Sequence, residues 1–137
     1  MTVVGVPAEI KTDEKRVGIT PFSARELISA GHQVVVQSGA GVGIGADDDA
    51  YQGAGASIVD DAAAVFDQAE LIVKVKEPLA AERAMLRADH TLFTYLHLAA
   101  DEPQTRELID SGATCICLLY TSPSPRDATL SRMPSSA

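Results

Sequence analysis

The sequence predicts an α/β fold with a doubly wound, mostly parallel sheet. Short β-rich runs alternate with helical patterns along most of the chain, and helix start and stop signals stand between them. Strands that alternate with helices at this spacing form βαβ units, whose strands run parallel. A length of 137 residues is enough for one domain with a single core.

Each predicted element has its own signal. The strands are apolar, β-branched runs at residues 2–6, 32–37, 56–59, 71–76, 91–96 and 113–117. The helices are predicted at residues 21–30, 47–53, 61–68, 79–87 and 101–111. Thr20 and Pro21 are a typical N-cap and first helical residue, Gly31 ends that helix, and Pro78 and Pro103 stand where later helices can begin. The pattern indicates a Rossmann-like or flavodoxin-like sheet.

Composition and charge argue against several classes of function. With 46% hydrophobic and 22% charged residues, the chain is typical of a globular protein. No apolar run reaches the ~20 residues of a membrane span, and the N-terminus lacks signal-peptide order, so we expect a cytoplasmic protein without a membrane partner. A net charge of −8 argues against nucleic acid as a partner. A small anionic substrate remains possible beside a local cluster of cations.

The C-terminal residues break the pattern. Residues 117–137 contain three prolines and five serines and lose the apolar period, which predicts a disordered tail. This stretch also resembles translated sequencing-adapter or vector read-through, and the alternative is a genuine flexible tail. We therefore expect the native segment to be 1–116. Cys115 and Cys117 have no second Cys or His pair at ligand spacing, so packing is favoured over metal binding and no metal site is predicted.

A glycine-rich loop follows the second predicted strand. From Gly41 it reads G-V-G-I-G-A, which fits the dinucleotide fingerprint G-x-G-x-x-A. That fingerprint works because backbone N–H groups and a helix N-terminus face a pyrophosphate. Here the helix opens with three aspartates at 47–49, and the loop follows the second strand instead of the first. Asp60 does lie near the distance of a ribose-binding carboxylate, but we interpret the loop as a structural turn with no cofactor-binding residue.

Polar side chains follow three of the predicted strands. Arg16 comes after the first strand, Lys76 ends the fourth and His97 follows the fifth. The carboxyl ends of parallel strands meet at one edge of a sheet, so these groups should converge there. Glu9, Lys11, Glu77 and Pro78 are expected at the same edge.

Each of these residues also has a purely structural interpretation. Arg16 stands in a charged run that could simply be solvated. Lys74 and Lys76 alternate with valines, as on the wet face of an edge strand. His97 lies between leucines and could be a packing histidine. Taken singly these interpretations are favoured, but their shared edge favours a site.

Three motifs carry a family resemblance. The stretches "GVPAEIKTDEKRVGITPFSARELISAGHQVVVQSGAGVGIG", "LIVKVKEP" and "LFTYLHLA" resemble the N-terminal part of bacterial alanine dehydrogenases, from about Val3 to Ile116. That family is related to the soluble first domain of proton-translocating nicotinamide nucleotide transhydrogenase. The resemblance implies that this segment and a later C-terminal segment form the substrate domain. It also implies that NAD binds to an inserted domain beyond this chain and that the whole enzyme is a homo-oligomer, a hexamer.

The resemblance also assigns roles by motif. It implies that Arg16 of "EKRVGITP" grips the substrate carboxylate, Lys76 of "KVKEP" contacts the substrate, and His97 of "TYLHLA" is the catalytic acid/base. The transhydrogenase relatives keep the arginine but typically lack this second lysine and this histidine. The implied reaction converts L-alanine, NAD⁺ and water into pyruvate, ammonium and NADH. We expect the chain alone to be inactive. The alternatives are a fragment of the soluble transhydrogenase alpha subunit and a non-catalytic module that binds small carboxylates.

Overall fold

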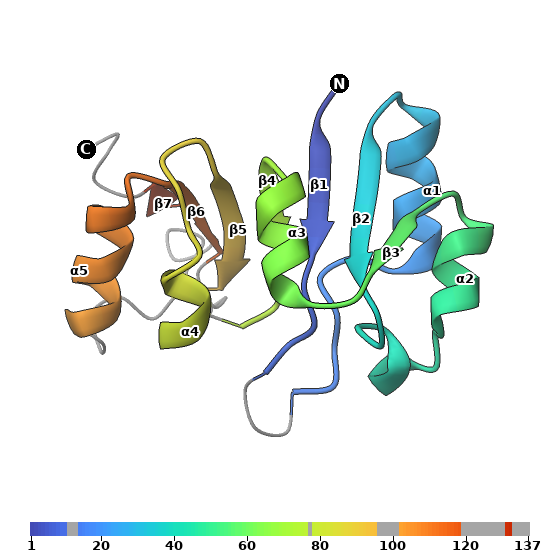
Figure 1. Ribbon diagram of the computed structural model, residues 1–137, viewed down its shortest axis with the longest axis horizontal. Helices are drawn as coiled ribbons and strands as arrows, with labels where there is room; N and C mark the ends of the chain where they lie inside the picture. Colours follow the sequence, from blue (N-terminus) through green and yellow to red (C-terminus); the bar gives the residue numbers. More distant parts are fainter. Residues whose placement is uncertain (11–13, 77, 96–101, 119–130, 133–137) are drawn as a thin grey trace, which may run out of the picture.

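The computed structural model describes residues 1–10, 14–76, 78–95, 102–118 and 131–132 (Figure 1). The strands are β1 (Val3–Val6), β2 (Gln33–Gln37), β3 (Ser57–Val59), β4 (Leu71–Val73), β5 (Thr91–Tyr95), β6 (Thr114–Leu118) and β7 (Ser131–Arg132). The helices are α1 (Pro21–Ser29), a 3-10 helix η1 (Val42–Ile44), α2 (Asp48–Gly53), α3 (Ala62–Gln68), α4 (Ala80–Arg83) and α5 (Glu102–Ser111).

The sheet has the order β3-β2-β1-β4-β5-β6-β7. Strands β1 to β6 pair in parallel, and the short β7 pairs antiparallel to β6. The predicted doubly wound, mostly parallel sheet is therefore confirmed, in the Rossmann order. This order reverses direction between β1 and β4, and ligands of such sheets bind outside the carboxyl ends of the strands at that switch point.

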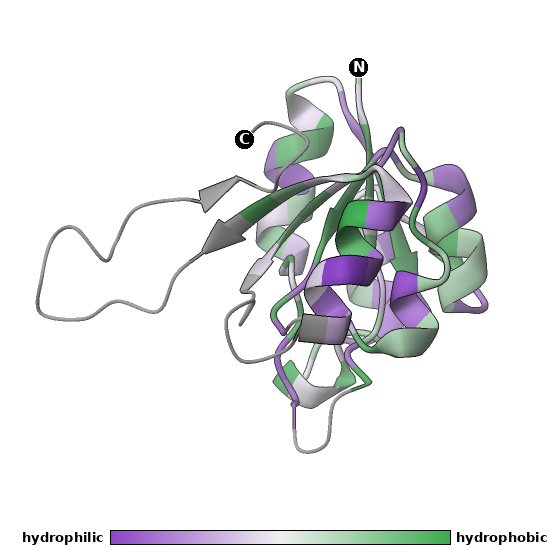
Figure 2. Cartoon of the chain, turned by 90° about the vertical axis from the view of Figure 1, so that its left-hand side faces the viewer, coloured by the Kyte–Doolittle hydropathy of each residue, from purple (hydrophilic) through white to green (hydrophobic). Residues whose placement is uncertain are grey.

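The helices cover both faces of the sheet. On β2, Val34 and Val36 pack in one cluster with Tyr51 of α2, whereas Val35 packs in a second cluster with Phe66 of α3. Strands buried on both faces are continuously apolar, which is why the run "VVV" is a central strand. Figure 1 shows α3 over the centre of the sheet, and Figure 2 shows the long strands mostly in hydrophobic colours with purple on the surrounding helices.

The predicted helix starts are observed. Thr20 has extended backbone and accepts a hydrogen bond from the Ser23 amide, with Pro21 at the first helical position. Asp47 and Asp61 cap α2 and α3 in the same way. Short polar side chains before apolar helical runs therefore fix the starts of three helices.

The predicted strand at 71–76 ends at Val73. Its last ladder bond runs from the Lys74 amide to the Phe93 carbonyl, after which the chain leaves β5. The amides of Val75 and Lys76 instead donate to the carboxylate of Glu9. The Glu9 carboxylate thus accepts the hydrogen bonds that a neighbouring strand would otherwise accept. Residues after Lys74 therefore do not continue the strand, although lysine and valine alternate there.

The predicted helix at 79–87 is also shorter. Helix α4 ends at Arg83, and the following amides of Met85 and Leu86 bond three residues back instead of four. Beyond them the Arg87 amide donates to Nδ1 of His90, a buried ring whose Nε2 lies 2.7 Å from the Phe66 carbonyl oxygen. The imidazole satisfies an amide that helix continuation would have used.

The structure describes only a few of the residues predicted to form the C-terminal tail, 117–118 and 131–132. Strand β6 reaches Leu118, and Cys115 within it is buried, as the packing interpretation predicts. The side chain of Cys117 and most of the predicted tail at 117–137 lie outside the described residues, so the boundary at 116 stays a prediction. Within the described ranges, no helix combines the length and apolarity that crossing a membrane requires.

Candidate functional site

A cavity of about 350 Å³ lies at the switch point of the sheet. Arg16 and Gly18 line it from the segment after β1, Val73 and Lys74 from the end of β4, and Phe93 from β5. The lining therefore comes from the segment after β1, from the carboxyl end of β4 and from the neighbouring β5. This is the edge at which the sequence predicts a site.

Arg16 holds a carboxylate already present in the chain. Its side chain is 61% exposed, whereas that of Glu14 is only 6% exposed. Nε and Nη2 of Arg16 donate to the two oxygens of Glu14 at 2.8 and 2.9 Å, and the Arg16 amide donates to Glu14 Oε1 at 3.0 Å. The paired bonds have the geometry with which a guanidinium binds a planar carboxylate. Sequence reasoning missed Glu14, since it stood in a run of exposed charges.

The pair with Arg16 lowers the pKa of the Glu14 carboxyl. The hydrogen bonds from the Arg16 side chain lower the pKa of Glu14 from its usual 4.5 to about 2, against the opposing effect of burial. Because the folded pKa is lowered, the ionised pair stabilises the fold above pH ~4.5, and this contribution is lost as the pH falls toward ~2.

We therefore expect the stability advantage of the unmodified chain over Glu14→Gln to shrink steadily between pH ~5 and ~2. Urea unfolding at intervals across this range measures the difference in unfolding free energy. Glu26→Gln, at an exposed position on α1, is the matched control. A difference for Glu14→Gln that does not change with pH would contradict the pair.

Lys76 is placed beside this pair. Its backbone is fixed at both ends of the residue, by the amide bond to Glu9 at 3.1 Å and by the Thr94 hydroxyl, which donates to its carbonyl at 2.9 Å. After the hydrogen bonds from Arg16, the charge of Lys76 adds to the lowering of the Glu14 pKa. The structure thus fixes the backbone of Lys76 after the end of β4.

Lys74 belongs to a buried ion cluster. Its side chain is 1% exposed, and Nζ lies 3.3 Å from Glu9 Oε1 and 2.7 Å from Glu82 Oε2. The other oxygen of Glu82 accepts the Leu79 amide at 3.0 Å. The edge-strand interpretation of Lys74 is therefore wrong, because β4 is central and this buried lysine forms ion pairs with two buried carboxylates.

His97 lies outside the described residues, as do Lys11 and Glu77. Strand β5 ends at Tyr95, two residues before His97 in the sequence. The structure therefore places Arg16 in the cavity lining and Lys76 after the end of β4, and the substrate roles of Arg16, Lys76 and His97 stay predictions.

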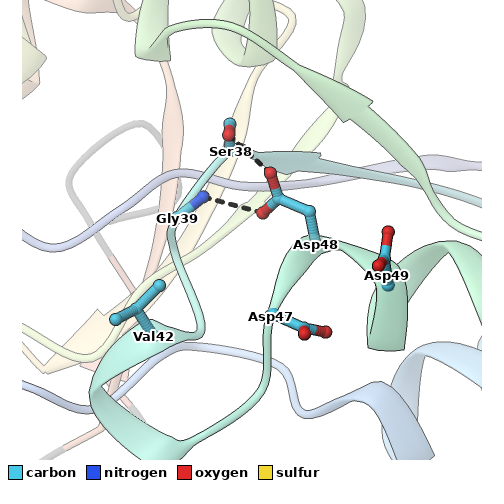
Figure 3. A pocket seen from close by; sticks show the side chains of 6 residues that line it. All are labelled: Ser38, Gly39, Val42, Asp47, Asp48 and Asp49. Atoms are coloured by element: carbon cyan, nitrogen blue, oxygen red, sulfur yellow. Dashed lines mark hydrogen bonds between the residues drawn. The ribbon is translucent and has the colours of Figure 1, made fainter.

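The glycine-rich loop does not fit a dinucleotide. Figure 3 shows the Asp48 carboxylate against this loop: the Gly39 amide donates to it at 2.8 Å and the Ser38 hydroxyl donates to its other oxygen. The amide hydrogen bond and then the hydroxyl lower the pKa of Asp48, so the loop already holds an anion of its own. Asp47 and Asp49 line the same hollow. A pyrophosphate would meet three carboxylates, which supports the interpretation as a structural turn.

No metal centre is formed within the described ranges, where no three His, Cys, Asp or Glu side chains are placed to share an ion. The acidic residues after β2 act as caps and loop ligands. The cavity at the switch point therefore presents the Arg16 guanidinium beside apolar side chains, and the Lys74 ammonium in its lining is already paired with Glu9 and Glu82.

Comparison with known proteins places this geometry in a family. The family model described as "Alanine dehydrogenase/PNT, N-terminal domain" matches residues 5–133. The alanine dehydrogenase of Halomonas elongata is 57% identical over 113 residues, which cover 82% of this chain and 30% of that protein. A solved L-alanine dehydrogenase superposes with a TM-score of 0.84 at 45% identity, over 91% of this chain and 34% of the other.

A transhydrogenase from Sinorhizobium meliloti is also similar. Its structure superposes with a TM-score of 0.79 at 28% identity, over 88% of this chain and 36% of that one. The chain thus spans about 30% of the length of the curated relative from Halomonas elongata. Since the family model matches most of its residues, the chain belongs to the alanine dehydrogenase/PNT N-terminal domain family.

Proposed function

We propose that the chain supplies the substrate-binding side of an NAD-dependent L-alanine dehydrogenase, a cytoplasmic hexamer that interconverts L-alanine and pyruvate. The observation that carries this proposal is a guanidinium in carboxylate-binding geometry on a cavity at the switch point of the sheet. Identity to the Halomonas elongata alanine dehydrogenase, at 57%, exceeds the 28% to the transhydrogenase, which favours the dehydrogenase over the transhydrogenase alternative.

In this proposal each residue has a separate task. Arg16 binds the carboxylate of pyruvate or alanine through parallel hydrogen bonds, in which the substrate carboxylate takes the place of Glu14. The Lys76 ammonium stabilises negative charge on the substrate oxygen as water or ammonia adds to or leaves the carbonyl carbon. His97 exchanges the protons that the carbinolamine must gain and lose, a task for which an imidazole with a pKa near ~6.5 is suited.

The redox step lies outside this chain. NAD supplies hydride acceptance when bound, and the described residues offer it no loop free of competing carboxylates. We therefore propose that the nucleotide is held by a segment beyond residue 116 of the full-length enzyme. The task of residues 1–116 is to fix the substrate in place.

A chimera tests this function. In it, residues 3–116 of this chain replace the matching segment of the Halomonas elongata alanine dehydrogenase. We expect the chimera to reduce NAD⁺ in the presence of L-alanine and the isolated chain to show no turnover. A folded chimera of native oligomeric state that lacks activity would contradict the proposal.

Within the chimera, His97→Ala should lower kcat by ~10²–10⁴-fold and change KM for pyruvate much less, because general acid–base catalysis acts on the chemical step. Steady-state kinetics in the direction of pyruvate amination measure both constants. His32→Ala is the control, since that ring accepts the Thr2 amide at the opposite end of the sheet. An unchanged kcat in His97→Ala would remove the histidine from the catalytic role.

A further inference from the structure

The glycine-rich loop is in close contact with the backbone of residues 14–20, which we call the arginine segment. Gly43, in η1, is the closest point: a methyl group added at its Cα would lie 2.2 Å from the Lys15 carbonyl oxygen and 2.9 Å from the Lys15 carbonyl carbon. Real side chains do not approach a backbone so closely, and the obstacle is peptide backbone, not a side chain that could turn away. Gly43 therefore allows a contact directly before Arg16 that no other residue type allows.

The arginine segment is held from its other sides as well. A methyl group at Gly18 would lie 2.4 Å from the Val73 carbonyl oxygen, so the segment packs just as tightly on β4. The buried hydroxyl of Tyr51, in the helix that follows the glycine-rich loop, donates to the Ile19 carbonyl at 2.6 Å. Backbone contacts at Lys15, Gly18 and Ile19 thus surround Arg16 on both sides in the sequence.

The same loop also forms part of the cavity wall. Ile44, the residue after Gly43, lines the cavity together with Arg16. A displacement of η1 would therefore move a wall of the cavity and the backbone that carries its guanidinium together. Through Ile44 the loop Gly41–Gly45 thus has a place in the cavity wall.

We propose that the glycine-rich loop Gly41–Gly45 is a positioning element for Arg16, with Gly43 as its positioning residue. The inference rests on the proposed function, since the place of Arg16 matters for catalysis only if it binds the substrate carboxylate. It explains why a sequence that fits the G-x-G-x-x-A pattern follows the second strand. Gly43 serves a close approach of two backbones, and Gly45 has the positive φ at which the 3-10 helix ends.

The expected size follows from the geometry. Relief of a 2.2 Å contact requires the loop and the arginine segment to separate by about 1 Å, and a misplacement of that size in a substrate-positioning group costs up to ~100-fold in rate. The bidentate bonds between Arg16 and Glu14 depend on the same backbone, so they report the displacement without any substrate.

The first experiment uses the chain itself. NMR titration of the Glu14 side-chain carboxyl should give a pKa of about 2 in the unmodified chain and in Gly53→Ala, where an added methyl group meets no atom within 4 Å. In Gly43→Ala the pKa should rise toward 4.5. Tyr51→Phe removes one hydroxyl with little change of volume and should raise it as well. An unchanged Glu14 pKa in folded Gly43→Ala would overturn the proposal.

The second experiment uses the chimera. Gly43→Ala should raise KM for pyruvate by ~10–100-fold with a smaller fall in kcat, whereas Gly53→Ala should leave both constants unchanged. If the unsubstituted chimera is inactive while the Glu14 pKa still moves in Gly43→Ala, the proposed function fails and the positioning of Arg16 by the loop stands. If the chimera is active and Gly43→Ala binds pyruvate normally, the loop is not a positioning element.

Discussion

Arg16→Ala in the chimera is expected to raise KM for pyruvate by ~10²–10³-fold, with a smaller change in kcat. Each hydrogen bond between charged groups contributes ~1.5–3 kcal/mol, and a guanidinium can make two of them to one carboxylate. Arg16→Lys should recover only part of the loss, because an ammonium keeps the charge but cannot donate in parallel. Steady-state kinetics with pyruvate as the varied substrate measure the effect.

Glu14 complicates this variant in a way that a second substitution resolves. Without Arg16, the Glu14 carboxylate would repel the substrate anion, so part of the loss would be repulsion. Arg16→Ala combined with Glu14→Gln separates the two effects, and Arg25→Ala on the exposed side of α1 is the control. A KM that stays within about threefold of the parent in the double variant would show that Arg16 does not bind the substrate.

Lys74→Met should be the most destabilising single substitution considered for the chain, at ~3–5 kcal/mol. It leaves the carboxylates of Glu9 and Glu82 buried without the cation between them. Within the described part of the chain, Oε2 of Glu82 receives no hydrogen bond, so its ion pair with Lys74 is what compensates its charge. The midpoint of urea unfolding measures the loss.

Two further variants show whether the stability lost in Lys74→Met comes from the lost charge or from the changed side-chain shape. Lys15→Met makes the same substitution at an exposed position and should change stability by less than ~0.5 kcal/mol. Adding Glu82→Gln to Lys74→Met removes one uncompensated charge and should recover part of the lost stability. Equal stability of Lys74→Met and the unmodified chain would mean that the cluster contributes nothing.

The sequence predicted the elements well where the signal is local. Thr20 and Pro21 are a short-range capping signal, and α1 begins at Pro21 as predicted. Helices α2 and α3 begin one residue after the predicted positions, because Asp47 and Asp61 are their N-caps. The apolar valine run of β2 likewise predicts a strand buried on both faces. From such elements the sheet class could be derived, together with a site at the carboxyl ends of the strands, where Arg16 lines the cavity.

Other features depend on contacts that no local pattern encodes. The strand at β4 stops early because Glu9, a residue from the first loop, takes its next amides. Lys74 has the sequence pattern of a solvated residue, yet it is buried between the carboxylates of Glu9, from the loop after β1, and Glu82, from the following helix α4. The requirement for glycine at position 43 likewise arises from Lys15, which is 28 positions away in the sequence.

The pairing of β1 with β4 affects when the site forms during folding. The bond from the Val75 amide to Glu9 joins residues 66 positions apart, and β1 becomes a central strand only when β4 adds to it. Closing so long a stretch of chain costs entropy before any contact compensates, so such pairings form late in folding. During synthesis, Arg16 therefore emerges from the ribosome long before β4, and the surroundings of its guanidinium are complete only after Val75 has left the exit tunnel.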